Sequence, residues 1–81
     1  MGHGVLRDYT EALYWLKKSA AQLNGTAEYN IGMYYIYGYG VDSNLKKAKY
    51  WIKRAYTNPY SPSNIKKSAK ETWEIYELGT R

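Results

Sequence analysis

The stretch Ala27–Trp51, AEYNIGMYYIYGYGVDSNLKKAKYW, decides how the rest of the chain is interpreted. Its pattern predicts a helix, a turn bracketed by Gly38 and Gly40, and a second helix. A similar turn, Gly2-His3-Gly4-Val5, opens the chain, and Gly4 lies 36 positions before Gly40. The same offset pairs four further residues: Ala12 with Ala48, Tyr14 with Tyr50, Trp15 with Trp51 and Lys17 with Lys53. Matches spread over a segment at one offset form an internal repeat, and this period is typical of stacked helical hairpins.

The composition is that of a small domain with an unusual aromatic content. The chain has 81 residues, with 11 Tyr, 3 Trp and no Phe, and a net charge of +5. Tyrosine buries its ring while its hydroxyl stays hydrated, which suits a thin structure in which most side chains lie near a surface. Cysteine is absent, which excludes disulfides, thiol catalysis and zinc–thiolate sites. No apolar run approaches the roughly 20 residues of a membrane span.

Capping signals predict where the first two helices begin and end. The first is expected at about 8–23, with Asp8 as N-cap and Glu11 completing a capping box. Asn24-Gly25 is expected to supply its left-handed C-terminal stop. The second helix is expected at about 26–37.

The last two helices are predicted from the same kinds of signal. Asn44 is expected to cap a third helix at about 44–57. A fourth is expected at about 62–78, with Ser61 as N-cap, Pro62 at the first helical position and Gly79 at the end. The apolar face predicted for it comprises Ile65, Ala69, Thr72, Trp73 and Tyr76.

Two faces of the third helix and three stripes of the second follow from helical periodicity. The inner face predicted for the third comprises Leu45, Ala48, Trp51, Ile52 and Ala55, and its outer face is a basic stripe of Lys46, Lys49 and Lys53. On the second helix, packing stripes are Ala27, Ile31, Tyr35, Gly38 and Tyr29, Gly32, Ile36. The third stripe is Asn30, Met33, Tyr34 and Tyr37, and a helix that is apolar nearly all round packs on several sides or presents one side to a partner.

These spacings resemble the Sel-one-like repeat (SLR) family of tetratricopeptide-type helical repeats. The residues that carry the resemblance are Ala27-x-x-x-Ile31-Gly32-x-x-Tyr35-x-x-Gly38-x-Gly40-Val41 and Lys47-Ala48-x-x-Trp51-x-x-Arg54-Ala55, with a partial copy from Gly2 to Ala20. The resemblance implies an all-α fold, a right-handed α–α superhelix of about four helices arranged as antiparallel hairpins. Leu23 stands where the family usually has glycine, so the first helix is expected to run longer.

The repeat pattern divides the chain, which is expected to be a single domain over 1–81. Residues 2–25 are a partial repeat, 26–57 a complete repeat, and 58–81 a loop and a C-terminal capping helix. The charged fourth helix fits a cap because terminal repeats of a solenoid need a hydrated outer face.

The sequence offers no convergent reactive groups, so an enzyme is not expected. His3 is the only histidine, the carboxylates are scattered, and Gly38-x-Gly40 lacks the rest of a phosphate-binding loop. No cofactor and no metal site are expected. The basic stripe and the abundant tyrosines suggest nucleic acid, but they lie on different helices and different sides, which argues against it.

The function predicted is non-catalytic protein–protein interaction, as an adaptor or scaffold. In such solenoids the first helix of each repeat lines the concave face, which here presents Asn30, Met33, Tyr34 and Tyr37 to a protein or peptide, with an acidic one favoured by the positive charge. An alternative places Tyr34 and Tyr37 under the fourth helix.

Two other functions stay open. One is self-association through an open N-terminal edge at Tyr9, Leu13 and Leu16, and the other is a small inhibitor or immunity-type protein. No compartment is identified. A chain without a signal-peptide pattern or a membrane span slightly favours the cytoplasm.

Overall fold

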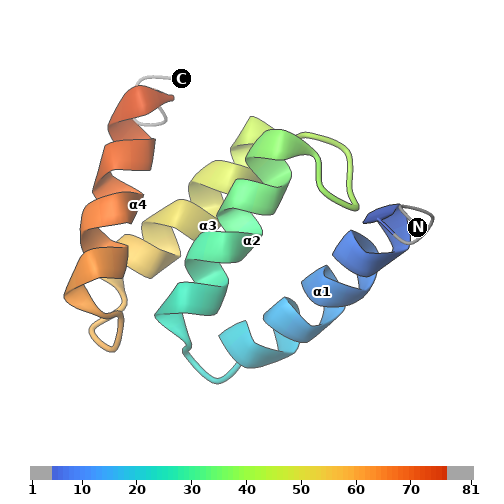
Figure 1. Cartoon of the computed structure of the whole chain (residues 1–81). Helices are drawn as coiled ribbons and strands as arrows, with labels where there is room; N and C mark the ends of the chain where they lie inside the picture. The colour runs from blue at the N-terminus through green and yellow to red at the C-terminus, as the bar shows by residue number, and fades with distance from the viewer. Residues whose placement is uncertain (1–4, 77–81) are drawn as a thin grey trace.

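Four α-helices make up the part of the chain that the structure, a computed structural model, describes, residues 5–76 with side chains from Asp8. They are α1 (Val5–Ala20), α2 (Gly25–Tyr37), α3 (Leu45–Thr57) and α4 (Ser63–Ile75). Figure 1 shows α1 and α4 on opposite sides of a central hairpin formed by α2 and α3. No strand occurs between residues 5 and 76, so the predicted all-α helical repeat is confirmed. Over this range no helix is long and apolar enough to cross a membrane.

The central hairpin is tight because α2 carries glycine where α3 carries isoleucine. A Cβ added at Gly32 would lie 2.5 Å from Cδ1 of Ile52, so any side chain there would displace the Ile52 side chain. Ile31, Ala48 and Ile52 are completely buried in this interface. Each isoleucine contributes about 2–3 kcal/mol of transfer free energy when it is removed from water.

The turn between α2 and α3 confirms the role predicted for its glycines. Gly38 adopts φ +75° and donates its backbone N–H to the Tyr34 carbonyl at 2.8 Å, which ends α2 in a left-handed cap. Gly40 adopts φ +71°, and a Cβ there would lie 2.8 Å from the backbone nitrogen of Thr10. The loop therefore lies directly on α1, and Asn44 then caps α3 by accepting from Lys47 N at 3.0 Å, as predicted.

The predicted bounds of α1 were wrong at both ends. Asp8 lies within the first turn of the helix, which already includes Val5, so it is not the N-cap. Gly2-His3-Gly4 lie outside the described residues. The helix ends at Ala20, and Leu23 adopts the positive φ of 63° that glycine was expected to supply. Asn24 begins the next helix instead, because its side chain accepts from Ala27 N at 3.1 Å, and Gly25 is the first residue of α2.

The predicted start of α4 was also wrong. Pro62 is the N-cap, no side chain caps the helix, and the Ser61 hydroxyl donates to the Ala55 carbonyl at 2.7 Å. The helix ends at Ile75, and Gly79 lies outside the described residues.

The predicted apolar face of α4 is confirmed. Ala69 and Thr72 are buried, and Ile65, Trp73 and Tyr76 pack around the core cluster of Ile52, Ala55 and Ala69. On α3, Leu45 does not belong to the inner face, because it is about half exposed at the first residue of the helix. The rest of the inner face is buried or packs against the core, as predicted.

Candidate functional site

The four residues of the predicted binding stripe on α2 do not form one continuous patch. Asn30 and Tyr34 line a groove on the side of α1. Met33 packs toward α4, where the Thr72 hydroxyl lies 3.9 Å from its sulfur. Tyr37 is about half exposed at the end of α2. The stripe therefore runs along the ridge of α2 and reaches toward both flanking helices.

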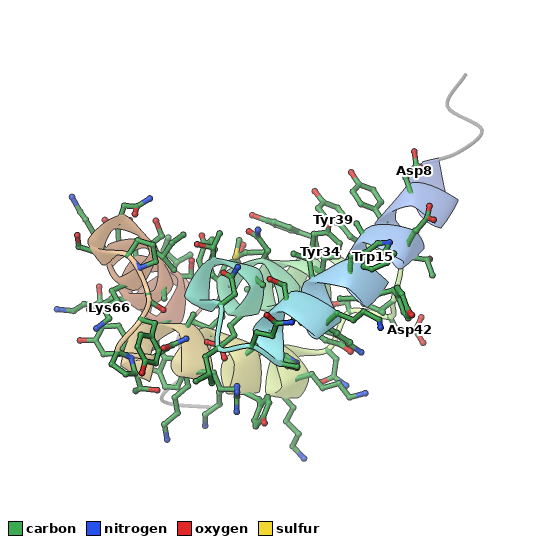
Figure 2. The ribbon with its side chains drawn as sticks, turned by 90° about the horizontal axis from the view of Figure 1, so that it is seen from below. Asp8, Trp15, Tyr34, Tyr39, Asp42 and Lys66 are labelled. Carbon is green, nitrogen blue, oxygen red and sulfur yellow. The ribbon has the colours of Figure 1, made fainter. Side chains whose placement is uncertain are left out.

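Tyrosine rings cluster where α1, the end of α2 and the following loop meet. The Tyr39 ring stacks on Tyr9, with centroids 4.4 Å apart, and Tyr34 meets both rings edge-on at 5.8 and 5.6 Å. The Tyr37 ring lies 5.2 Å from Tyr39. Figure 2 shows Tyr34 and Tyr39 next to each other beside α1. We call these four residues the tyrosine cluster.

The alternative arrangement, with Tyr34 and Tyr37 packed under α4, does not hold for Tyr34. Its ring contacts Tyr9 of α1 and Tyr39 of the loop, on the opposite side of α2 from α4. Tyr37 does reach the end of α4, because its hydroxyl hydrogen-bonds Tyr76. That hydrogen bond, with smaller contributions from desolvation and the nearby tyrosines, raises the pKa of Tyr76 above its ordinary value.

Sequence reasoning did not include Tyr9 and Tyr39 in the binding site. No periodicity links them to the α2 stripe, since one lies on α1 and the other in the turn. Their contact depends on the close approach of Gly40 to the α1 backbone, which is a tertiary feature.

A groove of about 550 Å³ lies between α1 and α2, and we call it the α1 groove. It is lined by Ala12, Trp15, Leu16, Ser19, Asn30 and Tyr34. Trp15 is 60% exposed there. Of the residues predicted to form an exposed N-terminal edge, Leu13 is buried at 5% exposure because α2 covers it, and Tyr9 and Leu16 are half-buried, so that expectation was wrong. The exposed side chain on this part of α1 is Trp15 instead.

A second groove, of about 350 Å³, lies at the other end of the molecule between α3 and α4. It is lined by Lys53, Tyr56, Thr57, Lys70 and Trp73. The predicted basic stripe does not behave as one surface, because Lys46 and Lys53 are exposed while Lys49 Nζ lies over the Trp73 ring at 5.9 Å. That side of α3 is also separate from the tyrosine cluster.

A buried carboxylate joins α2 to α3. Glu28 is only 1% exposed, and its Oε2 accepts from Arg54 at 3.2 Å (Nε) and 3.1 Å (Nη2). Its Oε1 accepts from Asn58 Nδ2 at 3.0 Å, and the same amide donates to the Leu23 carbonyl at 2.9 Å. A buried charge needs such partners because an uncompensated one costs several kcal/mol. Glu28 is therefore a structural group rather than a reactive one.

The internal repeat reappears in three dimensions as a cation–aromatic unit. On α3 the Tyr50 and Trp51 rings meet edge-on at 5.2 Å, and the Arg54 guanidinium lies 5.6 Å from each. On α1 the Tyr14 and Trp15 rings also meet edge-on at 5.2 Å, and Lys18 Nζ lies 5.3 and 6.0 Å from them. Positions that match at an offset of 36 thus have matching local geometry.

Comparison with known proteins identifies the repeat. A profile of the Sel1 repeat matches residues 1–22 and 25–60. Over 56 residues, 68% of the chain, the sequence is 41% identical to the ERAD-associated E3 ubiquitin-protein ligase component HRD3B of Arabidopsis thaliana. The match covers 8% of the length of that protein. No solved structure matches the chain.

Proposed function

The chain belongs to the Sel1 repeat family, and from this premise we propose that it recognises a protein or peptide segment through the exposed ridge of α2 and the tyrosine cluster. Sel1 repeat proteins bind other proteins, and the family points to a non-catalytic interaction module. Within residues 8–76 no three His, Cys, Asp or Glu side chains gather into a group that could hold a metal ion. The proposal concerns this segment, which corresponds to a small part of its relative HRD3B.

The observation that carries the proposal is the tyrosine cluster. Tyrosine buries a large area with few rotatable bonds, and interfaces are enriched in it for that reason. The rings of Tyr9, Tyr34 and Tyr39 hold each other in place by stacking and edge-on contacts. Tyr37 adjoins them and is about half exposed, so a partner can cover it without disturbing the fold.

We propose an acidic partner segment, because the net charge is +5 and exposed lysines surround the helices. A positive surface speeds the encounter with an acidic partner and slows it with a basic one. Association should therefore weaken as the ionic strength rises.

The test is partner capture by the whole chain, followed by binding measurements with Tyr37→Ala. Truncating an exposed aromatic anchor should weaken binding at least tenfold. Tyr60→Ala is the matched control, because Tyr60 is even more exposed but lies in the loop before α4. Both variants should keep the circular dichroism of the parent. Normal binding by Tyr37→Ala would exclude this surface.

A further inference from the structure

The face of α1 that lines the α1 groove corresponds, at the repeat offset, to the face of α3 that packs against α2. Ala48, Ile52 and Ala55 are completely buried between neighbouring helices. Their equivalents 36 positions earlier are Ala12, Leu16 and Ser19, and these line the α1 groove. The structure thus contains two copies of the same helix-binding face, which we call seats. The seat on α3 is occupied by α2, and the seat on α1 is open.

The groups that bind the buried carboxylate also have equivalents on α1. Arg54 and Asn58 hold Glu28, and the residues 36 positions earlier are Lys18 and Gln22. Both are exposed, and Lys18 lies on the Tyr14 and Trp15 rings much as Arg54 lies on Tyr50 and Trp51. A cation and an amide donor at this spacing are the pair that receives a carboxylate in the occupied seat.

The helix that fills the occupied seat defines what would fill the open one. On α2, Glu28 places its carboxylate against Arg54 and Asn58, and Gly32, one turn later, lies against Ile52. The small residue is needed because the Ile52 side chain occupies the space of a Cβ. In the open seat Leu16 takes the place of Ile52.

We propose that the α1 groove binds an amphipathic helix of a partner protein that carries a glutamate against Lys18 and Gln22 and a glycine or alanine four positions later against Leu16. This rests on the proposed function, since it names the class of partner that such a module recognises. It also explains why Trp15 remains largely exposed while its equivalent Trp51 packs on the core. A helix in the groove would cover the Trp15 ring.

A second copy of this chain does not supply that helix. Ala69 is the small buried residue of α4, as Gly32 is of α2, and the residue four positions before it is Ile65, so α4 of another copy would bring no carboxylate to Lys18 and Gln22. Stacking of copies in the register of the repeat would therefore leave Lys18 and Gln22 without the carboxylate that Arg54 and Asn58 bind on α2.

The test is a titration of the whole chain with a labelled helical peptide that carries the Glu-Tyr-x-x-Gly-Met pattern of residues 28–33. The peptide is stapled on its outer face, because isolated helices of this length are marginal in water. We expect saturable binding by fluorescence anisotropy. Lys18→Glu should weaken it about tenfold or more, because it removes a charge-assisted contact and adds repulsion. A peptide with lysine in place of the glutamate should restore binding to the Lys18→Glu variant.

Two controls keep the outcome interpretable. Lys46→Glu makes the same charge change at an exposed lysine of α3 and should leave the affinity unchanged. A peptide with leucine in place of glycine should lose binding to the parent chain, because the helix can no longer approach Leu16. Circular dichroism of each variant confirms that the fold is intact.

Three results would overturn the inference. They are no peptide binding by the parent chain, equal affinity for the parent and Lys18→Glu, and a concentration-dependent dimer in sedimentation that Trp15→Ala abolishes, which would assign the groove to a second copy. If partner capture depends on Tyr37 but not on Lys18, the proposed function stands and this inference fails. Capture that depends on neither residue overturns both.

Discussion

Replacing Arg54 by methionine should destabilise the chain by about 2–3 kcal/mol, because the buried carboxylate of Glu28 loses its cation. Methionine keeps much of the volume and flexibility of the arginine stem. The change therefore removes the two hydrogen bonds to Oε2, at 3.2 and 3.1 Å, with little loss of packing. One donor remains for the carboxylate, Asn58 Nδ2 at 3.0 Å.

The magnitude follows from the burial of the two partners. Removing one partner of a fully buried ion pair costs about 3–5 kcal/mol. Glu28 is 1% exposed but the Arg54 side chain is 39% exposed, so water can reach part of the vacated space and the cost is reduced. A domain of this size is stable by only about 5–10 kcal/mol. The variant should therefore lose a large part of its stability while still folding.

A double-mutant cycle in urea denaturation, followed by circular dichroism, isolates the interaction. Glu28→Gln removes the charge and keeps the shape, and should cost about 1–2 kcal/mol. The double variant should be more stable than the sum of the single losses predicts, by about 1–2 kcal/mol, because no unpaired charge stays buried. Lys53→Met, at the exposed neighbouring position, should change stability by less than about 0.5 kcal/mol. Additive losses in the double variant would refute the assignment of Glu28 as a charge held by Arg54.

Leu23→Gly should stabilise the chain by about 0.5–1 kcal/mol, because relief of the left-handed strain at φ 63° exceeds the added entropy of the unfolded chain; loss of stability in urea would contradict this. Gly32→Ala should destabilise it by about 1–2 kcal/mol, since the new Cβ meets Ile52 Cδ1 at 2.5 Å, and Ile52→Val in the same background should recover part of the loss. Tyr37→Phe should lower the pKa of Tyr76, because it removes the hydrogen bond that raises it. A raised pKa means that the folded state favours the neutral phenol, so this contribution is complete below the ordinary pKa of 10.0 and is lost as the pH rises through the folded value. NMR titration of labelled tyrosines in the parent and in Tyr37→Phe measures the difference, and an unchanged Tyr76 titration would exclude the hydrogen bond as its cause.

The sequence predicted helix caps and turns correctly at residues that have only one possible local role. Asn44 accepts from Lys47 N, and Gly38 and Gly40 adopt positive φ, as their types and positions indicated. Prediction failed where two signals competed for one residue. Asn24 can end one helix or begin the next, and Ser61 can cap α4 or hydrogen-bond the Ala55 carbonyl, and only the packed structure selects between these partners.

The binding stripe shows a similar limit. Helical spacing placed Asn30, Met33, Tyr34 and Tyr37 on one ridge of α2, but it could not show which flanking helix each side chain approaches. Tyr34 turns to the tyrosine cluster and Met33 to α4, because α1 and α4 cover different sides of α2. Whether the stripe binds a partner stays a prediction.

By itself the sequence determined the family and the helical repeat, because turn glycines, small helix-contact residues and tryptophans recur at one offset and each acts through local backbone or volume constraints. Only the tertiary structure decided which copy of each repeated residue is covered. Trp51 packs against the core and Trp15 is exposed, although their sequence surroundings are alike. Burial depends on which helix lies alongside, and that is a property of the packed structure rather than of any residue.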